Sequence, residues 1–430
     1  MRIVKLTEDN KKDLLDKLLK RSTQSYPEYE KTVAEIIDNI KTNGDKALFE
    51  YTLKFDKFEL TKDNIRVTRD EIAAAYKELD AEYVEVIKKA KENIRDYHEK
   101  QVRQTFITTK PDGSILGQRR SSIASAGTYV PGGKAAYPSS VLMNIVPAKV
   151  AGVEKIVMVT PPGKDGKVNP GTLVAADIAG VDEIYKVGGA QAIAALAFGT
   201  ESVPKVDKIT GPGNIFVALA KKAVYGNVGI DSIAGPSEIV VLADETPRAR
   251  YVAADLLSQA EHDELASAIL VTTSEELAQK VSDEVDGFLK VLERADIIKK
   301  SLDNFGYIFV ADSMSDAIDA VNEIAGEHLE ILTKNPFETM TKIKNAGAMF
   351  LGEYSSEPLG DYFAGPNHIL PTNGTSRFFS PLSVDDFIKK SSIICYSEEG
   401  LKKVHKDIEL FAAKEGLTAH ANSIRVRFED

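Results

Sequence analysis

Cysteine is almost missing from this chain of 430 residues: Cys395 is the only one. A single cysteine excludes an internal disulfide and a metal cage made of thiolates. A metal site in this chain must therefore use histidine, carboxylate and amide ligands. Histidine is also scarce, with six residues, so each one can be weighed individually as a candidate for chemistry.

Long apolar runs and a positive net charge are missing as well. The N-terminal residues are charged throughout, with no apolar region of the signal-peptide kind, and no run is long enough to span a membrane. The formal net charge of -11 argues against nucleic acid or an anionic membrane as a main partner. Hydrophobic residues make up 43% and charged residues 28%, as in globular proteins, and we expect a cytoplasmic protein.

The spacing of apolar residues predicts an α/β fold with helical ends. Residues 1–106 have helical spacing, including a predicted helix over 11–20 and a capping-box pattern at Thr68 and Glu71. The turn sequence Pro111-Asp112-Gly113 then predicts a β-hairpin. Beyond it, short β-branched runs alternate with helical segments in two blocks, which indicates two parallel sheets built from βαβ units.

A chain of this length is expected to form two to four domains. We expect a helical region over residues 1–106, a first α/β domain over 107–236, a second over 237–386, and a helical tail over 387–430 that ends in an extended piece, SIRVRF. The strands predicted within the two α/β domains are 155–159, 183–187, 208–210, 238–242, 268–272, 307–311, 330–333 and 348–351.

One predicted helix, over residues 251–264, carries two candidate metal ligands. Gln259 and His262 are three residues apart and would share a face of the helix, with Asp255 one turn below Gln259. A carboxamide and an imidazole side by side could bind a metal. Glutamine is a rare ligand, however, and a polar helix edge with a solvated histidine is the alternative.

Three glycine-rich segments could approach an anion or a nucleotide. They are VGGAQ around Gln191, TGPGN ending at Asn214, and GTYVPGG around Tyr129. None of them is the G-x-G-x-x-G fingerprint of dinucleotide-binding domains. Tight turns between strand and helix explain the first two equally well. The third is either a turn or an aromatic lid over a flat ligand.

Other polar residues lie at expected ends of elements. Ser237 precedes a strand without the G-x-S-x-G elbow of a nucleophile, so a binding contact is the better interpretation. Glu327 and His328 form a candidate acid–base pair. Asp361 and His368 lie in one long predicted loop, and Glu415 and His420 lie in the tail. Together, Gln259, His262, Asp361 and His420 could complete a four-ligand site for zinc or a similar ion. His98 and His405 have charged neighbours and are predicted to be solvated.

Long motifs spread from about residue 119 to 423 make a family recognisable. They are SAGTYVPGG, VGGAQAIAALAFGT, ITGPGNIFVALAKK, IDSIAGPSE, LLSQAEHD, EHLE, GDYFAGPNHILPTNGTSRF and EGLTAHANS. On these motifs the chain resembles histidinol dehydrogenase, the NAD-dependent enzyme that completes histidine biosynthesis. One departure is Gly326, where proline is expected before the Glu-His pair; we expect only a change in the stiffness of the loop.

The resemblance implies two incomplete Rossmann-like domains and one zinc ion per subunit. It implies zinc ligands Gln259, His262, Asp361 and His420, substrate contacts that include these four together with Ser237, His328, His368 and Glu415, and NAD contacts Tyr129, Gln191 and Asn214. It also implies an intertwined homodimer in which Glu415 and His420 complete the partner's site.

The implied reaction is a four-electron oxidation of L-histidinol through L-histidinaldehyde to L-histidine with two NAD+. His328 would take the alcohol proton, and Glu327 would activate the water that adds to the aldehyde. Zinc would position the substrate. Two alternatives remain: a zinc hydrolase, which leaves the glycine-rich segments unexplained, and a non-enzymatic oligomeric binding protein, which predicts no metal and no turnover.

Overall fold

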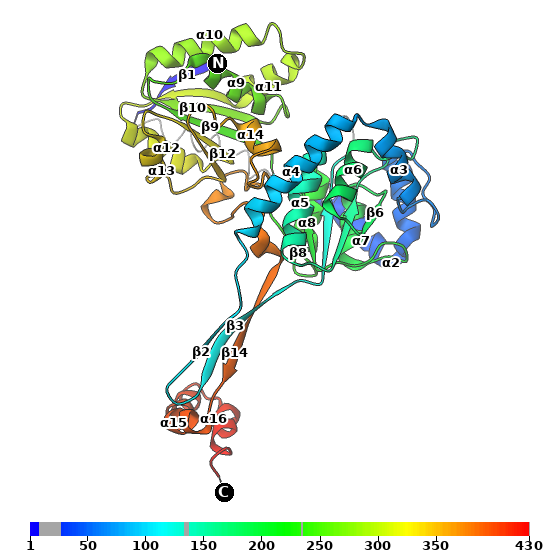
Figure 1. Ribbon diagram of the computed structural model, residues 1–430, viewed down its shortest axis with the longest axis vertical. Helices are drawn as coiled ribbons and strands as arrows, with labels where there is room; N and C mark the ends of the chain where they lie inside the picture. Colours follow the sequence, from blue (N-terminus) through cyan, green and yellow to red (C-terminus); the bar gives the residue numbers. More distant parts are fainter. Residues whose placement is uncertain (8–26, 133–136, 234, 430) are drawn as a thin grey trace. The chain divides into compact units, whose positions relative to one another are not determined.

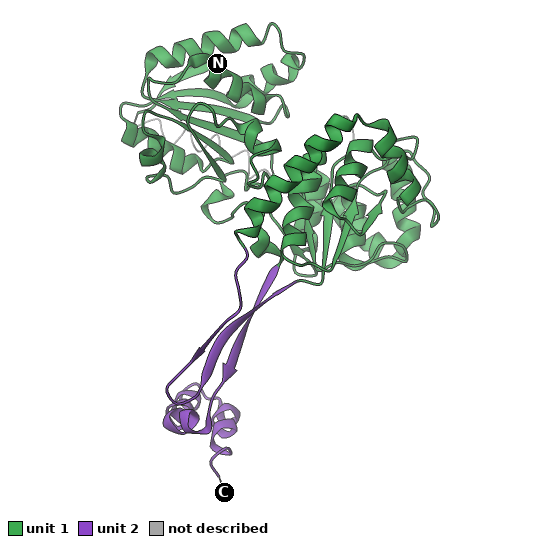
Figure 2. Cartoon of the chain, viewed as in Figure 1, with its two compact units in different colours: residues 1–101, 123–387 green, residues 102–122, 388–430 purple. Residues whose placement is uncertain are grey.

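The computed structural model describes the chain except for residues 8–26, 133–136, 234 and 430, so the helix predicted over 11–20 lies outside the described residues. The described residues form two compact units (Figure 2). Unit 1 comprises residues 1–101 and 123–387, and unit 2 comprises residues 102–122 and 388–430.

The first sheet of unit 1 has five parallel strands in the order β6-β5-β4-β7-β8. The chain lays down β4, β5 and β6 in one direction, then returns to the other side of β4 for β7 and β8. The strand order therefore reverses at β4, and in open α/β sheets ligands bind outside the carboxyl ends of the strands at such a reversal. The strands are β4 (Ser125–Tyr129), β5 (Lys155–Val159), β6 (Glu183–Tyr185), β7 (Lys208–Thr210) and β8 (Gly229–Ile230).

Helices cover both faces of this sheet, as Figure 1 shows. Alternate residues of β5 point to opposite faces: Val157 and Val159 pack with α2, α7 and α8, whereas Ile156 and Met158 pack with α3 to α6. Burial on both faces explains why these strands are almost entirely apolar. The helices are α2 (Pro27–Asp56), α3 (Arg69–Glu78), α4 (Ala81–Glu99), α5 (Pro138–Val150), α6 (Pro170–Ala179), α7 (Gly189–Phe198) and α8 (Ile215–Val224).

The second sheet of unit 1 has six parallel strands in the order β1-β11-β10-β9-β12-β13. Its strand order also reverses, at β9. The strands are β1 (Arg2–Lys5), β9 (Glu238–Ala243), β10 (Ser267–Thr272), β11 (Gly306–Val310), β12 (His328–Leu332) and β13 (Ala348–Leu351). The helices are α9 (Ala249–Ala260), α10 (Glu275–Phe288), α11 (Ala295–Phe305), α12 (Met314–Ile324), α13 (Pro336–Met340) and α14 (Glu357–Tyr362), and the 3-10 turns η2 (Thr375–Arg377) and η3 (Val384–Phe387) follow.

Unit 2 is a three-stranded antiparallel sheet followed by two helices. β2 (Phe106–Thr109) and β3 (Ile115–Ser122) form the predicted hairpin, and β14 (Ile388–Cys395) pairs with β3 along its whole length. The helices α15 (Glu398–Lys414) and α16 (Thr418–Arg425) complete the unit. Our expected domain boundaries divide the chain differently, because they assign residues 107–122 to the first α/β domain.

The predicted fold class, with two parallel α/β sheets, is confirmed, and all eight strands predicted in the α/β domains are present. The capping box at Thr68 is also confirmed. Several details are wrong. The first residues form strand β1, the GTYVPGG segment begins inside strand β4, and the tail opens with strand β14. The piece SIRVRF is not extended, since α16 runs through its first residues.

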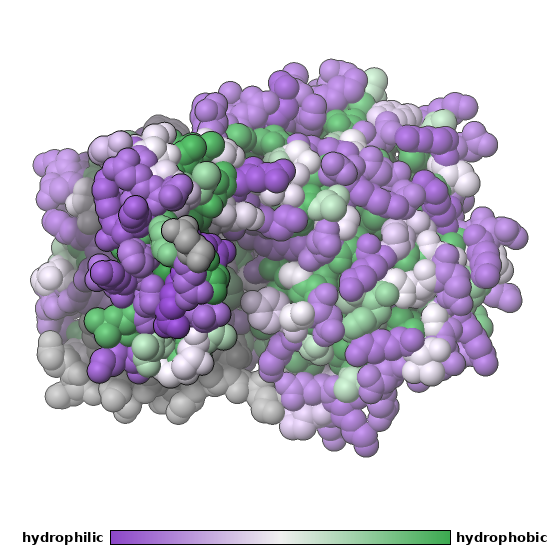
Figure 3. Space-filling view, turned by 90° about the horizontal axis from the view of Figure 1, so that it is seen from below, coloured by the Kyte–Doolittle hydropathy of each residue, from purple (hydrophilic) through white to green (hydrophobic). Residues whose placement is uncertain are grey.

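The surface is mixed in character. In the face shown in Figure 3, hydrophilic residues cover most of the visible area and apolar residues form small islands between them. Among the residues that the structure describes, no helix combines the length and apolar character needed to cross a membrane.

Candidate functional site

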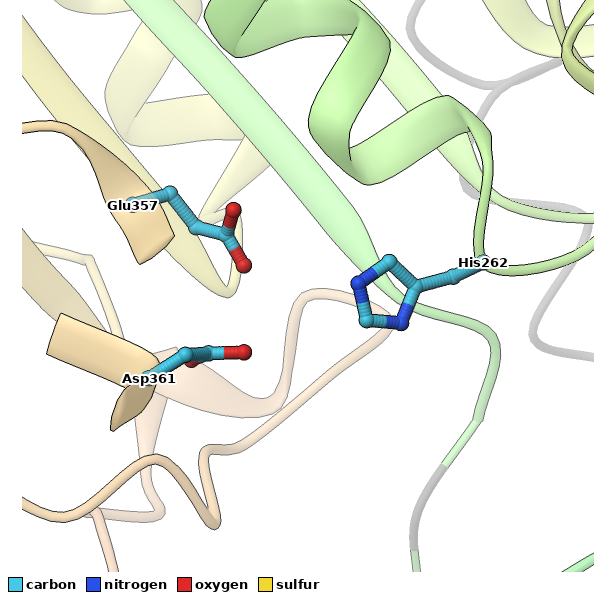
Figure 4. Close-up of side chains that lie close together, drawn as sticks. All are labelled: His262, Glu357 and Asp361. Atoms are coloured by element: carbon cyan, nitrogen blue, oxygen red, sulfur yellow. The ribbon is translucent and has the colours of Figure 1, made fainter. Parts of the chain in front are cut away.

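Three side chains of metal-ligand type converge beside the second sheet. Glu357 and Asp361 are four residues apart on α14, so both project from one face of that short helix. His262 approaches them from the turn after α9 (Figure 4). One ligand atom from each residue lies within 4.8 Å of the others. Two carboxylates and an imidazole at this spacing match the donor set of a divalent cation.

Gln259 lies three residues before His262, in the last turn of α9. Its side chain is 1% exposed, and its Oε1 atom has no hydrogen-bond partner among the described residues. A buried amide oxygen without a donor is costly, so a cation at this place would satisfy it. The predicted helix over 251–264 ends earlier than expected, at Ala260. His262 therefore lies in the following turn, where its main-chain N–H donates to the Gln259 carbonyl oxygen at 3.2 Å.

Further buried acids hold α14 in place. The main-chain N–H of Glu357 donates to Glu330 Oε1 at 2.9 Å, and Ser258 Oγ donates to Glu357 Oε2 at 3.0 Å. Glu330 also interacts with the neighbouring carboxyl group of Asp255. Burial raises the pKa of Asp255 to about 6 and that of Glu330 well above its usual value. Asp255 thus supports the cluster through Glu330.

Glu327 and His328 lie at the amino end of β12, where both are buried. Glu327 Oε2 accepts a hydrogen bond from the main-chain N–H of Glu238 at 2.8 Å. His328 Nδ1 lies 3.0 Å from the Glu238 carbonyl oxygen, which can only accept, so Nδ1 carries the proton. His328 Nε2 is buried, has no hydrogen-bond partner among the described residues, and lies 3.6 Å from Asp361 Oδ1. In the neutral ring, Nε2 is therefore the atom that can accept a proton.

The charges in this region shift each other's pKa values. Burial raises the pKa of Glu327 to about 8. Burial alone would lower the pKa of His328, but the carboxylates of Glu327 and Asp361 raise it to about 10. Burial would raise the pKa of Asp361, whereas its contact with His328 and the charge of His368 lower it to about 2. A cation on the carboxylates would offset the negative charge that holds the His328 proton.

His368 and Ser237 border the same cluster. His368 Nδ1 donates to the Asp361 carbonyl oxygen at 2.9 Å, and its Nε2 lies 3.3 Å from Ser140 Oγ on α5. Ser237 immediately precedes β9 and is followed by Glu238, whose main chain binds both members of the Glu327–His328 pair. The structure therefore brings together His262, Glu327, His328, Asp361 and His368, with Ser237 one residue from their network. Gln259 lies in the last turn of α9, three residues before His262.

A cavity of about 610 Å³ lies at the carboxyl ends of the first sheet's strands. The three residues predicted to contact NAD, Tyr129, Gln191 and Asn214, all line it. Tyr129 ends β4, and its hydroxyl oxygen accepts from the main-chain N–H of Gly189 at 3.2 Å. Asn214 caps α8 with its side-chain oxygen. The cavity is wide enough for a nucleotide, and its walls also include Phe55, Pro131, Pro161, Pro162, Lys164, Lys167 and Phe216.

Two residues of the two sites were missed in the sequence, and one histidine outside them was misread. Glu357 was counted only as part of a loop, although its spacing of four from Asp361 is a helical signal. Asp56, which lines the cavity, carries no motif at all. His98 is wrong as a solvated histidine: it is fully buried, with Nδ1 donating to the Ile94 carbonyl oxygen and Nε2 facing Asn367, and burial lowers its pKa.

The remaining two predicted site residues belong to unit 2. Glu415 is the C-terminal cap of α15 and His420 lies on α16, and both are exposed. Their predicted part in the site stays a prediction.

A nucleotide-sized cavity in one α/β domain and a cluster of metal-ligand type at the other are typical of two-domain α/β dehydrogenases. The family model described as histidinol dehydrogenase matches residues 19–428. The chain belongs to the histidinol dehydrogenase family.

Individual relatives are similar to this protein along nearly the whole chain. The histidinol dehydrogenase of Clostridium acetobutylicum is 60% identical over 430 residues, covering 99% of both chains. That of Bacillus subtilis is 58% identical over 410 residues, covering 95% of this chain and 96% of the relative. The crystal structure of histidinol dehydrogenase from Elizabethkingia anophelis superposes with a TM-score of 0.94 at 39% identity, covering 99% of this chain and 98% of that one.

Asp56 gives a prediction about stability and pH. It is the last residue of α2, its Oδ2 atom is buried without a hydrogen-bond partner among the described residues, and burial raises its pKa to about 6. A carboxyl group whose pKa rises on folding favours the folded state only while protonated. Its ionisation therefore destabilises the fold increasingly from about pH 4 to 6, and fully above pH 6.

We accordingly expect Asp56→Asn to raise the free energy of unfolding at pH 8 by about 1 kcal/mol, discounted for partial exposure, or the Tm by about 1 °C. The gain should shrink toward zero near pH 4. Thermal unfolding followed by circular dichroism at both pH values measures it. Asp38→Asn, an exposed site on the same helix, is the control. Equal gains at pH 4 and pH 8 would contradict this account.

Proposed function

We propose that the protein is a zinc-dependent, NAD-linked histidinol dehydrogenase that oxidises L-histidinol through L-histidinaldehyde to L-histidine. The observation that carries the proposal is the Nε2 atom of His328, which has no hydrogen-bond partner among the described residues and lies 3.6 Å from Asp361 Oδ1 in a cluster of metal-ligand type. The family supplies the substrate, and the cavity at the first sheet supplies a place for the nucleotide. A cytoplasmic location stays a prediction.

The donor set of this chain suits a zinc ion. Gln259, His262 and Asp361 would hold it, and His420 of a second copy would complete four ligands. The orphaned oxygen of Gln259 and the low pKa of Asp361 support this assignment, since both groups present a free acceptor to a cation. Glu357 reaches the same place and is a further oxygen donor. When bound, the ion would hold the amine and imidazole nitrogens of histidinol and so orient the substrate.

The first oxidation needs a base and a hydride acceptor. His328 Nε2 would take the proton of the substrate hydroxyl while hydride leaves the same carbon for C4 of the nicotinamide ring of NAD+. The hydrogen bond from Nδ1 to the Glu238 carbonyl oxygen holds the ring in the tautomer that this step requires. NAD+ would lie against Tyr129, Gln191 and Asn214, whereas Ser237 and His368, with Glu415 of a second copy, would contact the substrate.

The second oxidation needs a water molecule. Glu327 would accept a proton from water as its oxygen adds to the aldehyde carbon, and hydride would then leave that carbon for a second NAD+. One water and two NAD+ are used, four electrons leave the substrate, and a carboxylate forms. Burial suits Glu327 to this role, because a carboxyl group with a raised pKa is a stronger base.

A zinc hydrolase would use the same cluster, with Glu327 activating a water. It gives no role to the cavity at the first sheet, which is lined by all three predicted NAD contacts. A binding protein without turnover gives no role to the buried Nε2 atom of His328 beside Asp361. The dehydrogenase uses both features.

The homodimer is supported by apolar side chains on unit 2. Ile394 of β14 is 73% exposed and Phe411 of α15 is 70% exposed, and Leu410 and Ile107 are exposed as well. Side chains of this size at such exposure favour burial against another protein surface. A second copy of the chain is the partner we propose, with its Glu415 and His420 completing the site.

The metal gives the first test of this function. Purified protein should contain about one zinc per chain, and chelation should abolish NADH production from histidinol. His262→Ala should lower the zinc content measured by elemental analysis, because it removes one of four ligands. His405→Ala, a histidine of unit 2 outside the proposed site, is the matched control and should keep its zinc. Full activity in metal-free protein would end the proposal.

The division of roles between Glu327 and His328 gives the second test. Glu327→Gln keeps an oxygen that can accept from Glu238, so the fold should be preserved. We expect it to slow oxidation of histidinaldehyde by about 100-fold or more and to affect the oxidation of histidinol much less. His328→Asn should slow both. Stopped-flow measurement of NADH from each substrate separates the steps, and equal losses for Glu327→Gln would show that the roles are assigned wrongly.

Sharing of the site between two chains gives the third test. The variants His262→Ala and His420→Ala should each be inactive. If one site draws His262 from one chain and His420 from the other, a mixed dimer has one site with both lesions and one intact site. Random mixing makes about half of the dimers mixed, so about a quarter of full activity should return.

The matched control mixes His262→Ala with Gln259→Ala, two residues expected from the same chain. Every site of that mixed dimer carries one lesion, so no activity should return. A pull-down with two tags confirms that mixed dimers have formed. If the His262 and His420 variants form mixed dimers that remain inactive, the site is built within one chain.

A further inference from the structure

A buried ion pair lies behind the glycine-rich turn that follows β7. Lys221 of α8 and Asp231, just after β8, form the pair, and their side chains are only 2% and 5% exposed. Lys221 is among the largest fully buried side chains of the described chain. Lysine is almost never fully buried unless it is paired, so this residue has a specific task.

Both members of the pair bind the main chain of one residue, Gly211. Lys221 Nζ donates to the Gly211 carbonyl oxygen at 2.9 Å, and the Gly211 N–H donates to Asp231 Oδ2 at 2.8 Å. The N–H and carbonyl groups of Gly211 are thus bound by two side chains of opposite charge. Hydrogen bonds to charged groups are shorter and stronger than neutral ones, so this contact fixes the start of the turn firmly.

On its other side Gly211 packs against Tyr129. Gly211 has φ +112°, which side chains rarely allow, and a Cβ atom added there would lie 2.1 Å from the Tyr129 carbonyl oxygen. The turn over residues 211–214 therefore lies between the ion pair and the end of β4. Tyr129 and Asn214, at its two borders, both line the cavity, whereas Lys221 and Asp231 do not.

We propose that the Lys221–Asp231 pair is a positioning device for the nucleotide: it holds the turn over residues 211–214 against Tyr129 and so sets the affinity for NAD+. This inference rests on the proposed function of the cavity. Stability alone is a poor explanation of the pair, because replacing both charges of a buried ion pair with neutral groups is often neutral or stabilising. If the pair serves to position the turn, replacing both charges should weaken the binding of NAD+ and change the stability of the fold little.

The test replaces both charges at once, with Lys221→Met and Asp231→Asn in one variant, so that neither charge is left buried alone. The amide oxygen introduced by Asp231→Asn can still accept from the Gly211 N–H, but the donor to the Gly211 carbonyl oxygen is gone. We expect NAD+ to bind about tenfold more weakly by calorimetry, a change of about 1.4 kcal/mol. Zinc content, the KM for histidinol and kcat at saturating NAD+ should stay close to wild type, because the cluster at the second sheet is untouched.

A matched control removes an ion pair at the amino end of β7, whereas the Lys221–Asp231 pair holds the turn that follows the carboxyl end of that strand. Lys208, the first residue of β7, donates to Asp386 Oδ1 at 3.0 Å. Lys208→Met with Asp386→Asn should leave NAD+ affinity unchanged. Unchanged affinity in the Lys221–Asp231 variant, or an equal loss in the control, would overturn the proposal.

A single variant decides the matter if the double variant does not fold. Lys221→Arg keeps the charge but moves the donor atoms, so it should fold and raise the KM for NAD+ several-fold without changing the KM for histidinol. Normal NAD+ binding by folded Lys221→Arg would overturn the proposal. Failure of the wild-type protein to bind NAD+ is a different result: it would refute the proposed cofactor, and this inference with it.

Discussion

Burial of negative charge at the amino edge of the second sheet is the constraint on which the functional site depends. Glu327, Glu330 and Glu357 are buried, and Asp361 is largely so. Among the described residues, Glu327 and Asp361 form ion pairs with histidines and not with lysine or arginine. Buried carboxylates are costly unless they are protonated, hydrogen-bonded or bound to a metal.

Three features of the structure reduce the cost of burying these carboxylates. Burial raises the pKa values of Asp255 and Glu330 and so favours their neutral forms, Glu327 accepts a main-chain N–H, and Asp361 lies beside two imidazoles. These contacts leave hydrogen-bond acceptors without donors among the described residues, including the side-chain oxygen of Gln259. A divalent cation is the ligand that this excess fits, and the same residues that would hold it also set the pKa of His328.

The two sheets of unit 1 have similar architecture, but their candidate sites lie at opposite edges. The first sheet uses the carboxyl ends of its strands, where the strand order reverses and the cavity lies. The second sheet uses the amino ends of β9 and β12, because Glu238 and His328 begin those strands. Gln259 arrives at the same edge because α9 runs antiparallel to β9. The second sheet thus has the carboxylate cluster at its amino edge, opposite to the edge at which the first sheet has its cavity.

Local patterns in the sequence predicted what local interactions determine. The central strands are apolar over four to six residues because both faces are buried, and the helices between them carry clear caps, such as Asn169 before α6. The proximity of Gln259 and His262 followed from their spacing of three. Two edge strands, β1 and β14, were missed, because they are only partly buried and lack a continuous apolar run.

Contacts between distant segments could not be predicted in this way. Nothing near Asp56 in the sequence indicates that the end of α2 reaches the cavity formed by β4, α7 and α8. The burial of His98 depends on Asn367, some 270 residues away. The roles of Tyr129, Gln191 and Asn214 came from the family resemblance alone, since three glycine-rich turns without a fingerprint fit several functions. Their common place in one cavity is information that only the fold contains.

Three histidines share one anchoring contact and differ in the group that their second ring nitrogen faces. His98, His328 and His368 each donate a proton from Nδ1 to a main-chain carbonyl oxygen. This shared contact leaves Nε2 as the free nitrogen of each neutral ring. Asn367 faces that nitrogen in His98 and Ser140 faces it in His368.

In His328 no described residue hydrogen-bonds to Nε2. The same anchoring through Nδ1 therefore leaves the Nε2 atoms of His98 and His368 beside an amide and a hydroxyl group, and that of His328 beside the carboxylate of Asp361. Because the rings are anchored alike, the difference between them lies in the partner of Nε2. In His328 that group is the carboxylate of Asp361, near the end of α14.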